Sequence, residues 1–151
     1  MPHLIDGHNL IGILPGLSLA DPEDERKLLD LLRRYARRTR RRMIVFFDQG
    51  NPIYRNPAGE GLVTARFIPP PRKADDAIYE FLAGRRDARN FTVVTSDLAV
   101  QRSARRAGAR VVSSAEFARQ LAAEEAPAPE NENPPQEPPE DLEDWLELFE
   151  E

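Results

Sequence analysis

An aspartate follows each of three short hydrophobic segments of this 151-residue sequence, at Asp6, Asp48 and Asp97, and the pair Asp75-Asp76 opens a helical pattern after a fourth segment. A single aspartate at such a place has an ordinary explanation, because turns and helix N-termini favour this residue. Several carboxylates at one place repel one another and need a cation to offset their charge. Oxygen ligands without histidine or cysteine are typical of Mg²⁺ or Mn²⁺, which can activate water for phosphodiester hydrolysis. The pattern therefore indicates metal-dependent phosphodiester cleavage, if the fold gathers these aspartates.

The segments around the aspartates alternate between strand and helix patterns. Short runs of β-branched and aromatic residues predict strands, and apolar residues at helical spacing predict helices. The expected strands are His3–Ile5, Met43–Phe47, Leu62–Ile68, Phe91–Thr95 and Arg110–Val112. The expected helices are Asp24–Arg38 (capped by Asp21-Pro22), Ala74–Ala83, Leu98–Ala107 and Ser114–Ala123. This alternation predicts an α/β fold with a central, mostly parallel five-stranded sheet and helices on both faces, in which ligands bind at the carboxyl ends of the strands.

Four stretches contain the aspartates, namely Leu4-Ile5-Asp6-Gly7-His8-Asn9-Leu10-Ile11-Gly12, Val45-Phe46-Phe47-Asp48, Lys73-Ala74-Asp75-Asp76-Ala77-Ile78 and Val93-Val94-Thr95-Ser96-Asp97-Leu98-Ala99, the last followed by Gly108-Ala109. Together and in this order, over about residues 3–121, they resemble the YacP-like branch of the NYN domain family, within the PIN-like nuclease superfamily. The resemblance implies a three-layer PIN-like (Rossmann-like) fold. It also implies a metal-dependent endoribonuclease that hydrolyses RNA with a metal-activated water, and mRNA on ribosomes as the substrate of some relatives.

The resemblance assigns roles by position. It implies metal ligands and catalytic residues at Asp6, Asp75, Asp76 and Asp97. Asn9 would position the metal water or a phosphate, Ser96 would hydrogen-bond within the site, and Asp48 would lie at its outer side. Gln101 stands about one turn beyond Asp97, where many nucleases of this superfamily have another acidic residue. A one-metal or slow enzyme is therefore an open alternative, with Gln101 as an outer residue of the site.

The charge of the chain is unevenly distributed. Residues 1–123 hold 21 basic and 14 acidic residues, a net charge of +7, whereas residues 124–151 hold 12 acidic residues and no basic one. A basic body suits a polyanionic partner such as RNA, although exposed arginines on a helix usually form only a solvated face. The candidates for RNA contact are Arg72, Lys73, Arg37, Arg41 and Arg102. His8 is a weaker candidate for contact with a phosphate or a leaving group.

The C-terminal residues have a different composition from the body. Six prolines and many glutamates between 124 and 140 predict a linker. Residues 141–151 place one apolar helical face in an acidic segment, formed by Leu142, Trp145, Leu146 and Phe149. We therefore expect a nuclease domain over 1–123, a linker over 124–140 and an acidic amphipathic segment over 141–151. This segment would dock on the basic body or on an unknown protein partner, and an inert solubilising tail is the alternative.

Other functions remain open from the sequence alone. A non-cleaving RNA-binding or ribosome-associated adaptor on the same fold would keep its RNA affinity when the aspartates are changed. Phosphoryl-transfer folds of the receiver or haloacid-dehalogenase type also gather aspartates, but they would need a lysine where Val112-Ser113 stands or a second aspartate where Gly7-His8 stands. The absence of cysteine and of a long apolar run favours a cytoplasmic protein without a membrane partner.

Overall fold

The computed structural model describes residues 2–48 and 61–125. The chain divides into two units, residues 1–121 and 122–151, and the second is described only over 122–125, the last residues of the helix that begins at Ser114. The elements in chain order are β1 (His3–Asp6), α1 (Gly7–Ile11), α2 (Asp24–Thr39), β2 (Met43–Asp48), β3 (Val63–Ile68), α3 (Ala74–Leu82), the 3-10 helix η2 (Ala88–Asn90), β4 (Thr92–Val94), α4 (Leu98–Ala107), β5 (Arg110–Val112) and α5 (Ser114–Glu125). None of the helices described is long and apolar enough to cross a membrane.

The five strands form one sheet in the order β3-β2-β1-β4-β5, and every neighbouring pair is parallel. The central strand β1 lies between β2 and β4, so Ile5 pairs with Val45 on one side and with Val94 on the other. Because all strands point the same way, the residues that follow β1, β2 and β4 lie next to one another at the carboxyl edge of the sheet. The predicted parallel five-stranded α/β fold is confirmed.

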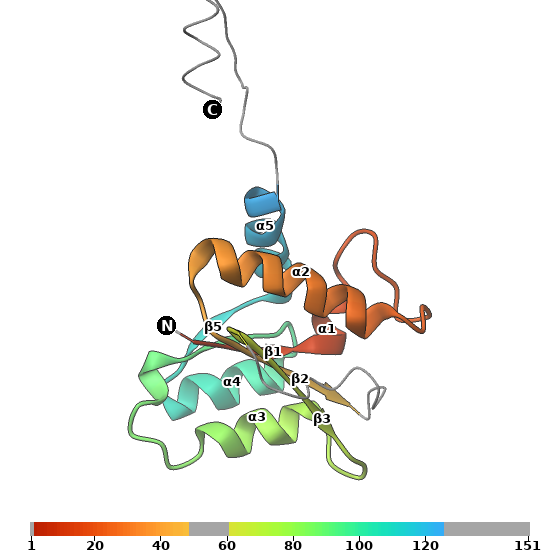
Figure 1. The fold of residues 1–151 in the computed structure, drawn as a ribbon. Helices are drawn as coiled ribbons and strands as arrows, with labels where there is room; N and C mark the ends of the chain where they lie inside the picture. Colours follow the sequence, from red (N-terminus) through yellow and green to blue (C-terminus); the bar gives the residue numbers. More distant parts are fainter. Residues whose placement is uncertain (1, 49–60, 126–151) are drawn as a thin grey trace, which may run out of the picture. The chain divides into compact units, whose positions relative to one another are not determined.

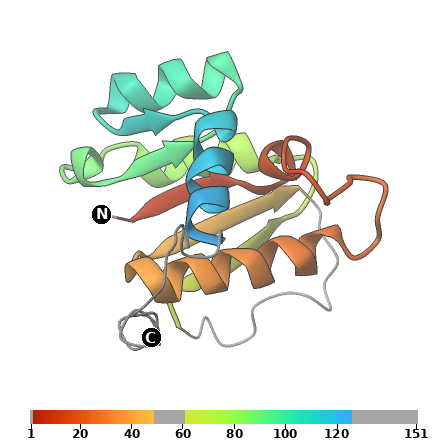
Figure 2. The same cartoon turned by 90° about the horizontal axis from the view of Figure 1, so that it is seen from above.

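The helices cover both faces of the sheet, because successive strand residues point to opposite sides. Ile5 and Val45 belong to a hydrophobic core shared with α1, α2 and the first part of α5. Leu4 and Phe46 belong to a second core shared with α3 and α4. Figure 1 shows α2 on one side of the sheet and α3 with α4 on the other, and Figure 2 shows the orange α2 and the blue α5 over the same face. The result is a helix–sheet–helix arrangement of three layers.

Two local features near the carboxyl edge differ from the sequence expectations. The helix α2 begins at Asp24 as predicted, but Glu23 stands at its N-cap position instead of the predicted Asp21-Pro22. The Asp21 carboxylate accepts a hydrogen bond from the Glu23 N–H, at 2.9 Å, so it stabilises the turn that leads into the helix. The helix α1 was not expected, because five residues are too few to show a helical period. This helix carries His8 and Asn9 directly after Asp6.

The start of α1 is packed tightly against β2 through Gly7. A Cβ atom at this position would overlap ring atoms of Phe47 and would lie 3.1 Å from the Phe46 carbonyl oxygen. Phe47 is fully buried and its ring stacks on that of Phe67, so it cannot move away freely. Glycine therefore allows the chain that leaves Asp6 to pass next to the end of β2.

We expect Gly7→Ala to lower the free energy of unfolding by about 1–3 kcal/mol, because overpacking forces the buried Phe47 ring or the backbone to shift. Gly12→Ala is the matched control at the other end of α1. Gly12 has a right-handed conformation (φ −64°), and a Cβ there would meet its nearest neighbour at 3.6 Å, an ordinary contact. Urea unfolding of the two variants checks this prediction. Equal stability of both would show that the close approach of α1 to Phe47 has no energetic importance.

Candidate functional site

Three carboxylates interact at the carboxyl edge of the sheet. Asp6 ends β1, Asp48 ends the neighbouring strand β2, and Asp75 lies in the first turn of α3. Burial raises the pKa of Asp6 to about 6, and the negative charges of Asp48 and Asp75 contribute to the increase. Hydrogen bonds from the Thr95 hydroxyl and the Asn9 backbone N–H act in the opposite direction. The structure thus brings three of the five predicted aspartates within electrostatic reach of one another.

Asp48 has a structural role in this arrangement. Its carboxylate Oδ1 accepts a hydrogen bond from the backbone N–H of Ala74, the first residue of α3. This bond joins the end of β2 to a helix that begins 26 residues later in the chain. It also satisfies one of the free N–H groups of the helix N-terminus. Because Asp75 is the next residue, this bond positions the backbone that carries the Asp75 side chain.

The Asp75 carboxylate carries an unsatisfied oxygen. Its Oδ1 is buried and has no hydrogen-bond partner within residues 2–48 and 61–125. A buried acceptor without a partner costs free energy, and a charged one costs more. Its neighbour Asp6 is itself poorly solvated. An acceptor in these surroundings is a suitable ligand for a cation.

Asp76 and Asp97 lie at the same edge, but their carboxylates cap helices. Asp76 accepts a hydrogen bond from the Lys73 backbone N–H at 2.9 Å, at the start of α3. Asp97 accepts hydrogen bonds from the N–H groups of Ala99 and Val100 at the start of α4. Both side chains are exposed. The roles of Asp76 and Asp97 as metal ligands therefore stay predictions, and capping alone already accounts for these residue types.

A hydrogen-bond network holds the Asp6 carboxyl in place from the β4 side. The Thr95 hydroxyl donates to Asp6 Oδ2 at 3.2 Å and accepts from the Asp97 backbone N–H at 3.1 Å. Gln101, buried in α4, donates its side-chain N–H to the Thr95 carbonyl oxygen at 2.7 Å. The predicted outer residue Gln101 thus orients the turn that carries Thr95. Sequence reasoning missed Thr95, although it stands in the stretch Thr95-Ser96-Asp97.

Asn9 connects three segments that are distant in the sequence. Its side-chain oxygen accepts hydrogen bonds from the Ser96 backbone N–H, at 2.9 Å, and from the Ser114 hydroxyl, at 2.6 Å. The Ser96 hydroxyl in turn accepts from the Ser114 backbone N–H at 3.1 Å. Sequence reasoning missed Ser114, which is fully buried. The sequence marks this serine only as the first residue of a predicted helix. Asn9 and Ser96 therefore hold the turns after β1, β4 and β5 together.

His8 is held on the side of the site that faces α2. Its ring nitrogen Nε2 lies 2.9 Å from Oε2 of the buried Glu25, and its ring packs against Phe47 at a centroid distance of 5.2 Å. These two contacts fix the orientation of the imidazole. They explain the residue structurally, and contact with a phosphate stays a prediction.

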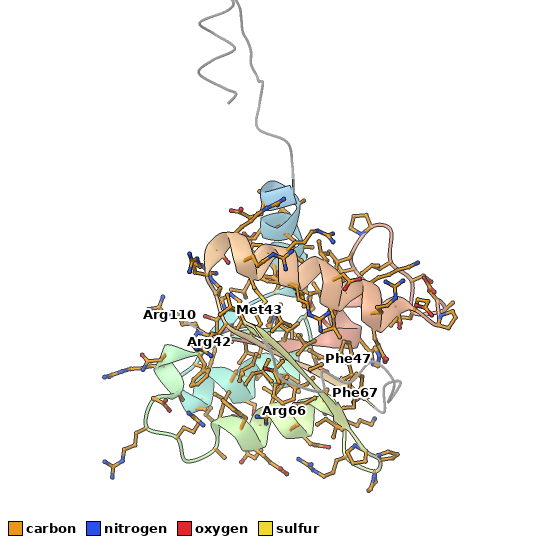
Figure 3. All side chains as sticks on the ribbon, viewed as in Figure 1. Arg42, Met43, Phe47, Arg66, Phe67 and Arg110 are labelled. Atoms are coloured by element: carbon orange, nitrogen blue, oxygen red, sulfur yellow. The ribbon has the colours of Figure 1, made fainter. Side chains whose placement is uncertain are left out.

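The basic candidates for RNA contact divide between the two edges of the sheet. Arg72 and Lys73 are exposed just before α3, at the carboxyl edge, and Arg72 is ion-paired with Glu80. Arg37 and Arg41 lie near the end of α2 and beyond it, where β2 starts, and Arg41 approaches His3 at 3.4 Å. Figure 3 shows this opposite edge, where Arg42, Met43 and Arg110 are labelled away from Phe47. Arg102 is exposed on α4.

Within residues 2–48 and 61–125, no three histidine or carboxylate side chains stand ready to hold a metal ion. The chemistry of the donors nevertheless fits a hard divalent cation, because Asp6 is poorly solvated and a buried oxygen of Asp75 lacks a partner among these residues.

The predicted docking residues Leu142, Trp145, Leu146 and Phe149 lie outside the described part of the chain.

We expect Asp6→Asn to stabilise the protein by about 1–2 kcal/mol at pH 8, because the neutral amide removes a charge that the fold disfavours. The folded state keeps the Asp6 proton up to a pKa of about 6, whereas the unfolded chain releases it near the ordinary value of 3.8. The free energy of unfolding therefore falls as the pH rises between these values, and the gain from Asp6→Asn should disappear below about pH 3.8.

Denaturant unfolding at pH 3.5 and pH 8 measures this difference. Asp97→Asn is the control, because asparagine caps a helix about as well as aspartate and the stability should change by less than about 0.5 kcal/mol. Destabilisation by Asp6→Asn at pH 8, or a gain of the same size at both pH values, would contradict the account of the Asp6 environment.

Comparisons with known proteins agree with this fold. The model of the YacP-like NYN domain matches residues 3–147. Two crystal structures of Rae1 (YacP) from Bacillus subtilis are similar to this chain at 27% sequence identity. A tryptophan-to-leucine mutant of Rae1 superposes with a TM-score of 0.66 over 81% of this chain and 75% of its own. Rae1 itself gives a TM-score of 0.65 over 82% of this chain and 74% of its own. A search of curated proteins gave no significant match. The chain belongs to the YacP-like NYN domain family.

Proposed function

We propose that this chain is a cytoplasmic, divalent-metal-dependent endoribonuclease that hydrolyses RNA phosphodiester bonds. The observation that carries the proposal is the buried carboxylate oxygen of Asp75, which has no partner among the described residues and lies within electrostatic reach of the poorly solvated Asp6. A protein that only needed stability would not place such groups together, because each disfavours the charge of the other. Their arrangement is explained if a cation completes the site.

The family relation supports the same function. NYN domains are generally nucleases, so an RNA-directed nuclease is the activity expected of a YacP-like member. The basic body of residues 1–123, with a net charge of +7, suits a polyanionic substrate. The resemblance to YacP-like proteins extends the proposal to mRNA presented on ribosomes.

The residues would divide the work as follows. Asp6 and Asp75 would hold the cation, with Asp48 fixing Asp75 through the start of α3. A bound Mg²⁺ or Mn²⁺ would supply Lewis acidity, which lowers the pKa of a water molecule and offsets negative charge on the phosphate. The Thr95 hydroxyl orients the Asp6 carboxyl, and Gln101 and Asn9 keep the surrounding turns rigid. Arg72 and Lys73, exposed beside Asp75, would attract the RNA backbone.

Single-turnover cleavage of an end-labelled RNA with Mg²⁺ or Mn²⁺ tests this proposal. We expect Asp6→Asn and Asp75→Asn each to lower the cleavage rate by at least about 100-fold, because preorganised electrostatic stabilisation of a transition state is worth that much. Asp87→Asn is the matched control, since Asp87 is exposed and paired with Arg85 beyond the end of α3. Its rate should stay within about twofold of the wild type.

Two results would overturn the proposal. If the double variant Asp6→Asn/Asp75→Asn still cleaves RNA at the wild-type rate, the assigned site is wrong. If the wild type binds RNA without cleaving it, and both aspartate variants bind equally well, the chain is the non-cleaving adaptor instead.

A further inference from the structure

A groove of about 450 Å³ runs between α3 and α4, and one of its ends is formed by Asp75 and Asp76. Tyr79 lines it from α3 and Ala83 from just beyond the end of that helix, and Ser103 and Arg106 are among the residues that line it from α4. Figure 1 shows the two helices on the same face of the sheet. Ala83 directly follows the last residue of α3 and lies eight positions after Asp75, so the groove extends over roughly 12 Å along the helix. It therefore leads away from the candidate site along α3.

The walls of this groove carry an exposed aromatic ring. Tyr79 is 60% exposed, although most large hydrophobic side chains of the described residues are in the two cores. It lies one helical turn beyond Asp75, on the same side of α3. Opposite to it, α4 presents the small residues Ala99 and Ser103. This leaves an exposed aromatic ring beside an open space, and proteins use exposed aromatic rings to stack the bases of single-stranded nucleic acids.

Positive charge accompanies the ring along α4. Arg106 lines the groove, and Arg102 precedes it by one turn of the same helix. Both are exposed, and neither forms an ion pair with the described part of the chain. Other arginines of the described residues, such as Arg26, Arg85 and Arg119, are paired with carboxylates. Two uncompensated cations beside a stacking surface are complementary to a phosphate backbone.

We propose that the groove between α3 and α4 binds the single-stranded RNA that flanks the scissile phosphodiester. A base stacks on Tyr79, and backbone phosphates contact Arg102 and Arg106. The inference rests on the proposed function, because it takes the strand to continue from the carboxylates at Asp75. It adds an RNA-binding groove beside the carboxylates, and this groove selects substrates with unpaired nucleotides next to the cleaved bond.

Binding measured without cleavage tests the stacking part. Fluorescence anisotropy of a labelled single-stranded RNA, in EDTA and with the full chain, gives the affinity of each variant. We expect Tyr79→Leu to weaken binding by about 5- to 150-fold, since it keeps apolar bulk but removes the aromatic face. Tyr79→Phe keeps the ring and should bind within about twofold of the wild type. Equal affinity of Tyr79→Leu and Tyr79→Phe would overturn the stacking role.

The salt dependence of binding tests the phosphate contacts. Arg102→Gln/Arg106→Gln should reduce the slope of log affinity against log salt by about 1.4, which corresponds to two lost contacts with a single strand. The control Arg40→Gln/Arg119→Gln removes the same charge from the face that carries α2 and α5, and it should leave the slope unchanged. Equal effects of the two double variants would overturn RNA binding in the groove. A groove that serves a protein partner would give wild-type RNA affinity for all four variants, which also overturns the proposal.

These outcomes are separable from those of the cleavage experiment. Loss of affinity in the groove variants, with no cleavage by the wild type, would support the groove and refute the nuclease. Cleavage by the wild type, with normal RNA affinity in every groove variant, would support the nuclease and refute the groove.

Discussion

The carboxylate of Asp6 stands at the end of a central strand that is buried on both faces, where desolvation disfavours its charge. Asp48 and Asp75 add negative potential to the same place. Folding therefore gathers like charges in poorly solvated surroundings, which by itself is unfavourable. The tight packing of α1 on β2, the bond from Asp48 to the start of α3 and the hydrogen bond from Thr95 all serve to hold this arrangement. The packing and hydrogen bonds of the fold hold the three carboxylates together in spite of their repulsion. In the proposed function, a bound cation offsets this repulsion.

The polar groups around the site explain how such an arrangement stays rigid. Asn9 joins the turns after β1 and β4 to the start of α5, and Gln101 fixes the carbonyl group of Thr95. None of these side chains needs to touch a substrate to matter. Each fixes a short turn at the carboxyl edge, where parallel strands leave their last residues without regular partners. The groove along α3 begins at the same edge, so substrate binding and charge placement share one rigid framework.

Much of this could be predicted from the sequence. Continuous apolar runs such as Met43–Phe47 gave the strands, and the aspartates after them indicated one edge of a parallel sheet. The functions of individual aspartates could not be separated, because an aspartate before a helix fits a cap as well as a ligand, as Asp76 and Asp97 show. The hydrogen bond between Asn9 and Ser114 could not be predicted either. The two residues are 105 positions apart, and no sequence pattern marks a serine as the partner of a distant side chain. Periodicity does not reveal α1, because five residues complete little more than one turn.

The central claim is that the Asp6 and Asp75 carboxylates form a cation site. The most direct measurement is the anomalous scattering of crystals soaked in Mn²⁺ above pH 7, where the Asp6 carboxyl, with a pKa of about 6, is ionised. The account predicts an ordered Mn²⁺ ion bound by oxygens of Asp6 and Asp75, and loss of this ion in Asp75→Asn. Ordered Mn²⁺ only at other carboxylates, or none at saturating Mn²⁺, would contradict it.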